Sequence, residues 1–456
     1  MARGKKKETL TPEDRLQAAL VPESEQPYKV PGNWCWVSLQ TIDQYRASST
    51  DPSKYPDTLF ELYSVPSSAD NYPEIVSGCE IGSTKQSVQK GDVLLCKINP
   101  RINRVWKVSQ YTENALLASS EWIIIRNSKI VSDYMMHCFR APYFREYMLS
   151  NVSGVGGSLM RAQPKYVKTY PVPVPPLPEQ QRIVDRIESL FAKLDEAKQK
   201  AQDALDSFET RKAAILHKAF TGELTAQWRK EHSVGMESWK EETLESVCYS
   251  IFDGDHMPPP KSEKGIPFLV ISNVNTGHLS FENTRFVPES YYEALSDTRK
   301  PGYGDVLYTL VGSYGIPVIV DSEHPFCFQR HMALLKPKNI DSYYLWYILQ
   351  SREMFEKATQ IATGTAQLTV PIKGLRQLKF NCASANEQGE IVRILDDLLA
   401  KEQQAKETAE GVLEQIDLIK KAILARAFRG ELGTNDPSEE SAVELLKRAS
   451  ERGEKA

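Results

Sequence analysis

The sequence predicts an α+β protein with a pseudo-twofold internal repeat: two mixed α/β globular domains separated by two long helices packed as an antiparallel coiled coil. Three observations support this fold class. At 456 residues the chain is about three times the length of an average domain. Residues 179–224 align without a gap on 387–432, with 20 of 46 positions identical. Both of these segments lack proline and repeat apolar residues at alternating spacings of four and three.

The repeat predicts the order of domains along the chain. Weaker similarity extends upstream of the repeated segments, where Trp34 matches Trp239 and the sequence Gly-Asp-Val-Leu occurs at 91–94 and at 304–307. The whole chain therefore resembles a tandem duplication. The expected segments are an N-terminal extension (1–27), a first globular domain (28–176), a central helical region (177–232), a second globular domain (233–383), a distal helical region (384–434) and a C-terminal tail (435–456).

The globular domains should combine short strands with short helices. Strand-like runs occur at 122–125, 306–310 and 318–320, and they are punctuated by Gly, Pro, Asn and Ser. Helical patterns near 133–149 and 342–358 precede the repeated segments. Mixed α/β domains are the expected result.

The repeated segments should form the helix pair. The apolar seam of the first is Ile183, Ile187, Leu190, Leu194, Ala197, Ala201, Ala204 and Phe208. The seam of the second is Ile391, Leu395, Leu398, Ala405, Ala409, Val412, Ile416, Ile419 and Ile423, interrupted by Glu402. A heptad seam of this length favours a coiled coil, with two ordinary core-packing helices as the alternative. Antiparallel pairing would place the globular domains at opposite ends of the rod.

Composition limits the function and the location. The net charge is 56 − 60 = −4, so a nucleic-acid role would need local basic patches. Seven scattered cysteines without a C-x-x-C pair argue against a disulfide framework and a zinc site. No run approaches eighteen apolar residues and the N-terminus is polar and Lys-rich, so we expect a cytoplasmic protein without membrane contact.

Catalytic motifs are missing from the sequence. It contains no GxxxxGK[ST], H-E-x-x-H or G-x-S-x-G element, and its seven histidines lack metal-ligand spacing. The glycines at 154, 156 and 157 do not follow a convincing βα unit, and Asn99-Pro100-Arg101 lacks the second proline and the aromatic residue of a methyltransferase motif. We expect no catalytic residues and no metal site, and binding is favoured over catalysis.

A basic segment in the first domain is the main candidate binding site. Six cations between Lys85 and Lys107 face the single acid Asp92. Arg and Asn side chains suit bidentate contacts with guanine and adenine, whereas Lys suits phosphates. The candidate DNA-binding residues are Lys97, Asn99, Arg101, Asn103, Arg104 and Lys107. The alternative is a solvated basic loop.

The second domain offers a less basic counterpart. After the same Gly-Asp-Val-Leu step, a Gly/Ser turn is followed later by a Gln-Arg-His run. The candidates there are Ser313, Tyr314, Gln329, Arg330 and His331. The matched position in the two halves makes both candidates more credible than either would be alone.

Several motifs together resemble the specificity (S) subunit of type I restriction-modification systems. Pro175-Pro176-Leu177-Pro178-Glu179-Gln180 is similar to the start of the helical region in that family, and Ala214 to Leu224 is similar to its end, which Ala422 to Leu432 repeats. Asp253-Gly254-Asp255-His256 with Pro258, then residues 265–269 and 273–274, resemble the opening of a target recognition domain. The second helical region lacks the paired prolines but keeps Glu387, Gln388 and Ile391. The resemblance covers about 34–432.

The resemblance implies a division of labour. Two target recognition domains would read the halves of a bipartite, asymmetric DNA site, while the helices set the spacer and dock two methyltransferase (M) subunits. S-adenosylmethionine, ATP and Mg²⁺ would belong to the M subunits and to restriction/translocase (R) subunits, so this chain would be a non-catalytic subunit without a cofactor of its own. We expect Phe220 and Phe428, in the helix ends 214–220 and 422–428, to offer apolar surface to the partners.

Two other classes of function remain possible at this stage. The chain could be the recognition scaffold of another phage-defence adenine methyltransferase system, or a coiled-coil adaptor without DNA contact. Co-purification with a methyltransferase supports the first two classes, and the presence of a translocating nuclease separates them. Absence of DNA binding by the assembled complex would leave only the adaptor.

Overall fold

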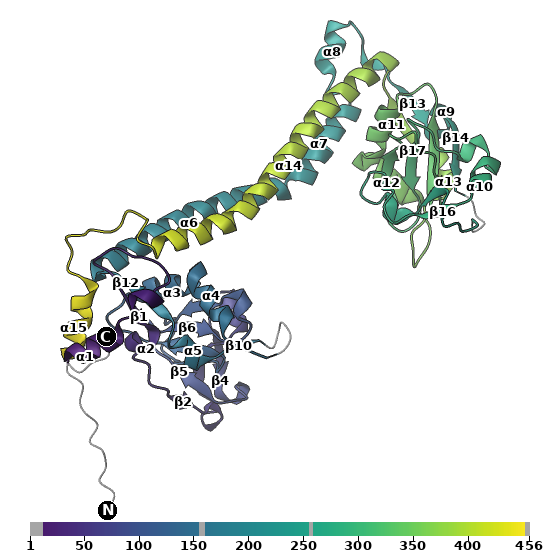
Figure 1. Cartoon of the computed structure of the whole chain (residues 1–456). Helices are drawn as coiled ribbons and strands as arrows, with labels where there is room; N and C mark the ends of the chain where they lie inside the picture. Colours follow the sequence, from purple (N-terminus) through teal and green to yellow (C-terminus); the bar gives the residue numbers. More distant parts are fainter. Residues whose placement is uncertain (1–11, 155–159, 255–258, 452–456) are drawn as a thin grey trace, which may run out of the picture. The chain divides into compact units, whose positions relative to one another are not determined.

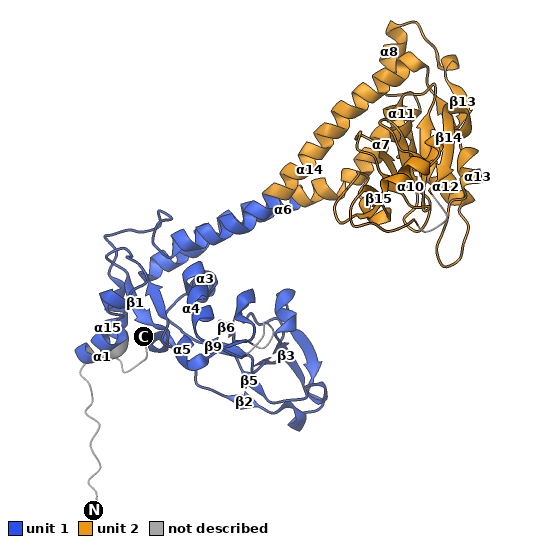
Figure 2. Ribbon diagram, turned by 45° about the vertical axis from the view of Figure 1, so that its right-hand side comes forward, with its two compact units in different colours: residues 1–200, 412–456 blue, residues 201–411 orange. Residues whose placement is uncertain are grey.

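The computed structural model describes residues 12–154, 160–254 and 259–451. The chain divides into two compact units, which Figure 2 colours separately: unit 1 contains residues 1–200 and 412–456, and unit 2 contains residues 201–411. The part of the sequence motif at 255–258 lies outside the described residues. Each compact unit therefore combines one globular domain with parts of both helical regions.

Unit 1 is built around small, mostly antiparallel sheets. A three-stranded sheet has the order β7-β6-β9 and a five-stranded sheet has the order β2-β5-β8-β3-β4. Among the described strands of these two sheets only the β3–β8 pair is parallel. The strands are β1 (Cys35–Ser38), β2 (Ser49–Thr50), β3 (Leu59–Tyr63), β4 (Glu74–Ser77), β5 (Lys85–Ser87), β6 (Val93–Cys96), β7 (Val105–Lys107), β8 (Ala115–Ala118), β9 (Trp122–Ile125), β10 (Val152–Ser153), β11 (Arg161–Ala162) and β12 (Pro171–Val174). The helices are α1 (Pro12–Ala19), α2 (Leu39–Ile42), α3 (Ser132–Arg140), α4 (Pro142–Ser150), α5 (Pro164–Val167), α6 (Leu177–Asp206, mostly in this unit) and α15 (Ala442–Glu451).

Unit 2 repeats the same plan with different sheet sizes. A four-stranded sheet has the order β14-β20-β17-β18, and a three-stranded sheet has the order β16-β15-β19. The strands are β13 (Lys240–Thr243), β14 (Cys248–Asp253), β15 (Ile266–Leu269), β16 (Arg285–Val287), β17 (Val306–Thr309), β18 (Pro317–Ile319), β19 (Cys327–Phe328), β20 (Met332–Pro337) and β21 (Lys379–Cys382). The helices are α7 (Phe208–Phe220), α8 (Ala226–Glu231), α9 (Leu244–Val247), α10 (Glu289–Ala294), α11 (Ser342–Leu349), α12 (Arg352–Ile361), α13 (Ile372–Arg376) and α14 (Ala385–Ala427, whose last part belongs to unit 1).

The repeat predicted from the sequence is present in the structure. In unit 1, β6 pairs with β7 and β9 on its two sides, and in unit 2 β17 pairs with β18 and β20 in the same way. The strand pairs β1–β12 and β13–β21 both close antiparallel before a long helix. The predicted mixed α/β domains and the internal repeat are confirmed.

The conserved Gly-Asp-Val-Leu step has the same structural role in both units. The glycine adopts a positive φ of 91° in the first copy and 83° in the second, which glycine tolerates without a steric penalty. The aspartate then pairs across the sheet: Asp92 binds Arg126 at 2.6 Å, and Asp305 binds Lys336 at 2.6 Å. Each step therefore fixes the start of a central strand.

The predicted helical stretch before each long helix is divided in two. Ala141 has ψ of 147°, outside the helical region, because the residue before a proline avoids helical geometry. Helix α3 therefore ends at Arg140 and α4 begins at Pro142. In unit 2, Ser351 caps α12 by accepting a hydrogen bond from the Met354 backbone N–H.

A tryptophan and a buried glutamate join each globular domain to its long helix. Trp34 Nε1 donates to Glu179 Oε2 at 2.7 Å, and Trp239 Nε1 donates to Glu387 Oε2 at 2.9 Å. Both carboxylates are fully buried. The next residue is matched as well: the Gln180 side chain accepts from the backbone N–H of Val131, and the Gln388 side chain accepts from that of Asp341. The matched residues at the start of the helical repeats are thus joints between a domain and a helix.

The long helices pair in each unit, and their polarity is antiparallel. In unit 1, Lys420 on α14 binds Asp195 on α6 at 2.5 Å. In unit 2, Arg211 on α7 binds Glu402 on α14 at 2.8 Å, so the charged interruption of the predicted seam is an ion pair between helices. The predicted coiled-coil fold is confirmed, with a one-residue interruption at Ser207 between α6 and α7.

The helix seam is more exposed than the heptad pattern predicts. Ile183, Ile187, Ile391 and Leu395 are fully buried because the globular domains pack on these helix ends. Away from the domains, the seam positions Ala204, Ala405 and Ile419 are exposed, and Ile419 has 42% of its surface free. The expectation that these three positions are buried in the seam is wrong.

The helix ends are covered by the globular domains. Phe428 is fully buried, with its ring 5.3 Å from that of Tyr134 in α3. Phe220 is 7% exposed and makes an edge contact at 5.4 Å with Tyr344 in α11. The expectation that Phe220 and Phe428 offer apolar surface to a partner is therefore wrong, because both rings belong to domain cores.

Candidate nucleic-acid interface

The loops β6–β7 and β17–β18 share one backbone frame. In the first, Asn99 and Asn103 have φ of 47° and 51°; in the second, Gly312 and Gly315 have φ of 73° and 88°. Each pair marks the third residue after one strand and the second residue before the next. Left-handed geometry is strained for residues other than glycine and is met least unfavourably by asparagine. Both loops therefore have a left-handed residue near each end, with three residues between the two positions in the first loop and two in the second.

A second loop fastens each hairpin. The Asn99 backbone N–H donates to the Met160 carbonyl at 2.8 Å, and the Gly312 N–H donates to the Leu368 carbonyl at 3.1 Å. Isolated β-bridges, Ile98 with Arg161 and Val311 with Thr369, lie next to these bonds. The loops of the two units are therefore held by equivalent main-chain contacts.

The structure brings together the two groups of candidates in unit 2. The Leu310 N–H donates to the His331 carbonyl at 2.8 Å, so the loop that carries Ser313 and Tyr314 starts beside the turn that carries residues 329–331. The equivalent bond in unit 1 joins the Lys97 N–H to the Glu121 carbonyl at 3.0 Å. Residues separated by about twenty positions in sequence thus share one surface.

The basic candidates of unit 1 differ in the exposure of their side chains and in whether their charges are paired. Arg101 is exposed at the loop tip, and Lys97 and Arg104 are partly buried. Lys107 binds Asp133 at 2.5 Å, so part of its charge is already compensated. Asn99 sets the loop geometry and Asn103 does so as well, with its side-chain amide directed to the Arg140 carbonyl at 3.3 Å.

The candidates of unit 2 are divided in the same way. Ser313 and Arg330 are exposed, whereas Gln329 and His331 are partly buried. Tyr314 stacks on Phe355 at 5.6 Å with an interplanar angle of 5°, and its hydroxyl lies 3.1 Å from that of Thr359. The Tyr314 ring is therefore held by contacts within its own domain.

Three residues of this surface in unit 1 do not stand out in the sequence. Arg145 on α4 donates to the Arg101 carbonyl, and Arg161 on β11 binds Glu121 at 3.2 Å while remaining 49% exposed. Ile102, at the tip, exposes 52% of its surface. No spacing pattern connects 145 or 161 to the loop, because only the fold places them there.

Burial keeps the nearby thiol neutral. The pKa of Cys96, at the end of β6, is raised mainly by burial, although its hydrogen bond to the Ile98 carbonyl and the charge of Arg104 act in the opposite direction. Apart from Ile102 and the paired carboxylate of Glu121, the surface that these loops form consists mainly of cations, amides and hydroxyls. Such groups can bind phosphates and the edges of bases, but they form no acid–base pair.

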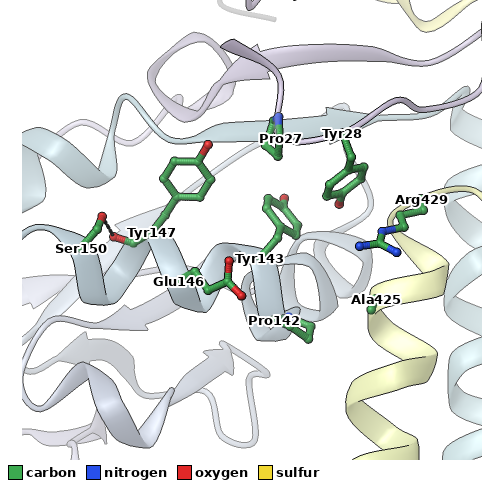
Figure 3. A pocket seen from close by; sticks show the side chains of 9 residues that line it. All are labelled: Pro27, Tyr28, Pro142, Tyr143, Glu146, Tyr147, Ser150, Ala425 and Arg429. Atoms are coloured by element: carbon green, nitrogen blue, oxygen red, sulfur yellow. Dashed lines mark hydrogen bonds between the residues drawn. The ribbon is translucent and has the colours of Figure 1, made fainter. Parts of the chain in front are cut away.

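Figure 3 shows a cavity of unit 1 with a volume of about 500 Å³. Its lining is Pro27, Tyr28, Pro142, Tyr143, Glu146, Tyr147, Ser150, Ala425 and Arg429. Arg429 lies 5.3 Å from the centre of the Tyr28 ring. Burial raises the pKa of Tyr28 and of Tyr143 well above the usual value, so these phenols stay protonated and do not act as bases.

A larger hollow in unit 2, about 920 Å³, lies between the helices α7 and α14 and the globular domain, and Phe208, Leu216, Trp346 and Phe355 contribute to its lining.

Within the described ranges no group of three or more His, Cys, Asp or Glu residues could hold a metal ion. In the same part of the chain no helix is long and apolar enough to cross a membrane.

The repeated fold and the paired loops define a class: a tandem-domain binding protein whose two domains present variable side chains on one conserved frame. Comparison with known families then identifies it. The model of the type I restriction modification DNA specificity domain matches residues 75–205 and 236–414, and the chain belongs to this family.

Individual relatives agree with the family. The chain is 26% identical over 321 residues to the EcoKI specificity subunit of Escherichia coli K12, which covers 68% of each protein. It is 30% identical over 209 residues to the EcoDI specificity subunit of Escherichia coli, covering 44% of this chain and 45% of the relative. The crystal structure of the HsdS subunit from Thermoanaerobacter tengcongensis has the same fold, with a TM-score of 0.65, 22% identity and coverage of 90% of this chain and all of the other.

Proposed function

We propose that this specificity subunit reads a bipartite, asymmetric DNA site, with one half-site for each globular domain. The observation that carries the proposal is the loop frame repeated in both domains, which holds different side chains at equivalent places. Lys97, Arg101 and Arg104 would contact the first half-site, and Ser313 and Arg330 the second. Asn99, Asn103, Tyr314, Gln329 and His331 would support these contacts by shaping the loops.

The helices would have two tasks in the assembled complex. They would set the spacing between the half-sites, and they would dock methyltransferase subunits, with restriction subunits joining the same assembly. Methyl transfer from S-adenosylmethionine and the ATP-dependent steps with Mg²⁺ would then take place in those partners. A pseudo-twofold chain suits this role because it offers two related surfaces to two copies of a partner.

The docking surface for the M subunit would include the exposed apolar side chains of α14. Leu418 is 62% exposed and Ile419 is 42% exposed, although both lie on a helix that packs against another helix. Exposed large aliphatic side chains in adjacent positions are typical of protein contact sites. They replace Phe220 and Phe428 as candidates for this contact.

The dependence of DNA affinity on salt tests the proposal. The chain is assembled with its methyltransferase, the target is found by mapping methylated adenines, and binding is measured between 50 and 200 mM salt. Each lost phosphate contact should reduce the slope of log K against log [salt] by about 0.9. The Lys97→Ala, Arg101→Ala double variant should therefore flatten the slope by about 1.8 if both side chains bind phosphates.

Lys107→Ala provides the comparison, because Lys107 is already paired with Asp133 and should change the slope much less. If Arg101 reads a base instead, its single variant should relax specificity at one position by about 1 to 3 kcal/mol without changing the slope. Unchanged slope and unchanged specificity in the double variant would reject the proposed contact of this loop with DNA.

A further inference from the structure

The tip of the β6–β7 loop carries an exposed aliphatic side chain inside a basic surface. The tip is the short turn Pro100–Ile102, in which Pro100 is buried and Arg101 is exposed. Ile102 leaves 52% of its surface in contact with solvent. A branched aliphatic residue that leaves 52% of its surface exposed in a polar loop gains less from burial in its own fold than a core residue does.

Several main-chain groups of this turn have partners within the protein. The Ile102 N–H donates to the Asn99 carbonyl at 3.1 Å, and the Asn103 N–H donates to the Pro100 carbonyl at 3.1 Å. The Arg101 carbonyl accepts from the Arg145 guanidinium. The exposed side chains of Arg101 and Ile102 are therefore the main groups that this tip offers to a partner.

The backbone geometry fixes where the Ile102 side chain is presented. Left-handed asparagines on both sides of the turn, together with the bond from the Asn99 N–H to the Met160 carbonyl, hold the tip in one shape. Two strained residues around a three-residue turn are typical of a loop whose tip has a binding role. The loop backbone therefore holds Ile102 in a fixed position.

DNA offers one apolar group that such a tip would match. In the major groove the bases present hydrogen-bonding groups, and thymine adds a C5-methyl group that aliphatic side chains contact. We propose that Ile102 packs against the 5-methyl group of a thymine in the first half-site, while Arg101 and Lys97 bind the polar groups around it. This inference rests on the proposed function, because it assigns a base contact to the same loop.

The second domain supplies an internal contrast. Its loop has one residue fewer between the left-handed positions: Ser313 is exposed, and Tyr314, which precedes Gly315 as Ile102 precedes Asn103, stacks on Phe355. That tip presents a hydroxyl where the first presents an aliphatic group. The methyl contact made by a loop tip should therefore belong to the first half-site alone.

Substitution of thymine by uracil tests the inference, because uracil lacks only the methyl group. Duplexes carrying the mapped target, with each thymine of the first half-site replaced in turn, are titrated with the assembled complex. Loss of one buried methyl corresponds to about 0.8 kcal/mol, or about fourfold in affinity. We expect one position at which uracil weakens wild-type binding about fourfold.

The Ile102→Ala variant should bind the thymine duplex more weakly and should no longer distinguish uracil from thymine at that position. Ile102→Val should keep most of the discrimination. Leu59→Ala is the matched control, because Leu59 is 48% exposed on β3 in the same unit and should leave the discrimination unchanged.

Three results would overturn the inference while leaving the proposed function intact. These are a first half-site without thymine, a uracil effect that persists in Ile102→Ala, and an Ile102-dependent rise in 2-aminopurine fluorescence, which would show insertion between bases in place of a methyl contact. Absence of any site-specific binding by the wild-type complex would instead reject the proposed function.

Discussion

The buried ion pair at the second domain–helix joint gives the sharpest stability prediction. The fully buried carboxylate of Glu387 accepts hydrogen bonds from Arg229 at 2.5 Å, from Thr225 at 2.6 Å and from Trp239 at 2.9 Å. The Arg229 side chain is 9% exposed and also donates to the Gly222 carbonyl. Within the described ranges, Arg229 is the only cation that forms an ion pair with Glu387, and Arg229→Met removes it.

The expected cost follows from what remains around the carboxylate. Removal of one partner of a buried ion pair costs about 3 to 5 kcal/mol, because the other charge is left without compensation. Two neutral donors still bind Glu387, so we expect Arg229→Met to destabilise unit 2 by about 3 kcal/mol. Addition of Glu387→Gln removes the stranded charge and should recover at least half of this loss.

The first joint is the natural comparison. There the buried Glu179 accepts from Trp34, from the Asn435 amide at 2.8 Å and from Thr434, all of them neutral. Loss of a hydrogen bond to a charged group costs about 1.5 to 3 kcal/mol, so Asn435→Ala should destabilise unit 1 by about 2 kcal/mol. Asn435 is neutral, so this variant breaks no ion pair and the second substitution has no counterpart here.

Hydrogen exchange in increasing urea measures the two units separately, because peptides from β13 and α11 report on unit 2 and peptides from β1 and α3 report on unit 1. Arg229→Met should lower protection in the first pair of peptides only. A loss below about 1 kcal/mol, or a double variant that is no more stable than Arg229→Met, would refute the reasoning that a stranded charge dominates.

The remaining predictions concern pH, assembly and spacing. Burial, followed by the charge of Arg140, lowers the pKa of His137 to about 4, whereas the unfolded value is about 6.5. Between these two pH values the folded state binds fewer protons than the unfolded state. The stability of unit 1 should therefore fall by about 3 kcal/mol as the pH drops from about 6.5 to 4. His137→Phe should remove most of that slope in urea titrations, and an unchanged slope would contradict the assignment. Leu418→Asp with Ile419→Asp should leave the fold intact but reduce methyltransferase binding in gel filtration. Leu177→Asp, at a leucine that is 45% exposed, should not reduce it; equal retention in both would exclude this surface. Insertion of four residues into each long helix, after positions 201 and 412, lengthens each helix by about 6 Å. The preferred DNA spacer should then grow by one to two base pairs, at about 3.4 Å for each base pair. Methylation of a DNA library with randomised spacer lengths measures this preference, and an unshifted preference would show that the helices do not set the distance.

The sequence was sufficient for the features that depend on local pattern. The repeat, the two long helices and the strand at 122–125 follow from spacing and composition, and the structure has them at these places. Phe220 and Phe428 were assigned wrongly because a helical pattern shows which residues are apolar but not which neighbour covers them. Each of these rings is buried by an aromatic residue more than 100 positions away in the sequence.

The candidate site was predicted in part for the same reason. The basic segment at 97–107 was visible as a local run of charge, but the pairing of Lys107 with Asp133 depends on helix α3, and Arg145 reaches the loop from α4. The structural role of Asn99 and Asn103 could not be predicted from the sequence. Asparagine is suited both to reading a base and to a left-handed turn, and the sequence does not distinguish these two uses.

The way in which the loops are held explains how two copies of one domain can acquire different specificities. The bonds that fasten each loop join main-chain groups, as in the contacts of Asn99 with Met160 and of Gly312 with Leu368, so they do not depend on the side chains at the tip. A change of Ile102 to a small polar residue such as serine therefore leaves these bonds in place. Because exposed tip residues contribute little to the core, such substitutions should change stability by no more than about 0.5 kcal/mol while they change which base is contacted. A recognition domain built in this way can diverge at its tip while the helix joints, with their buried carboxylates, remain constrained.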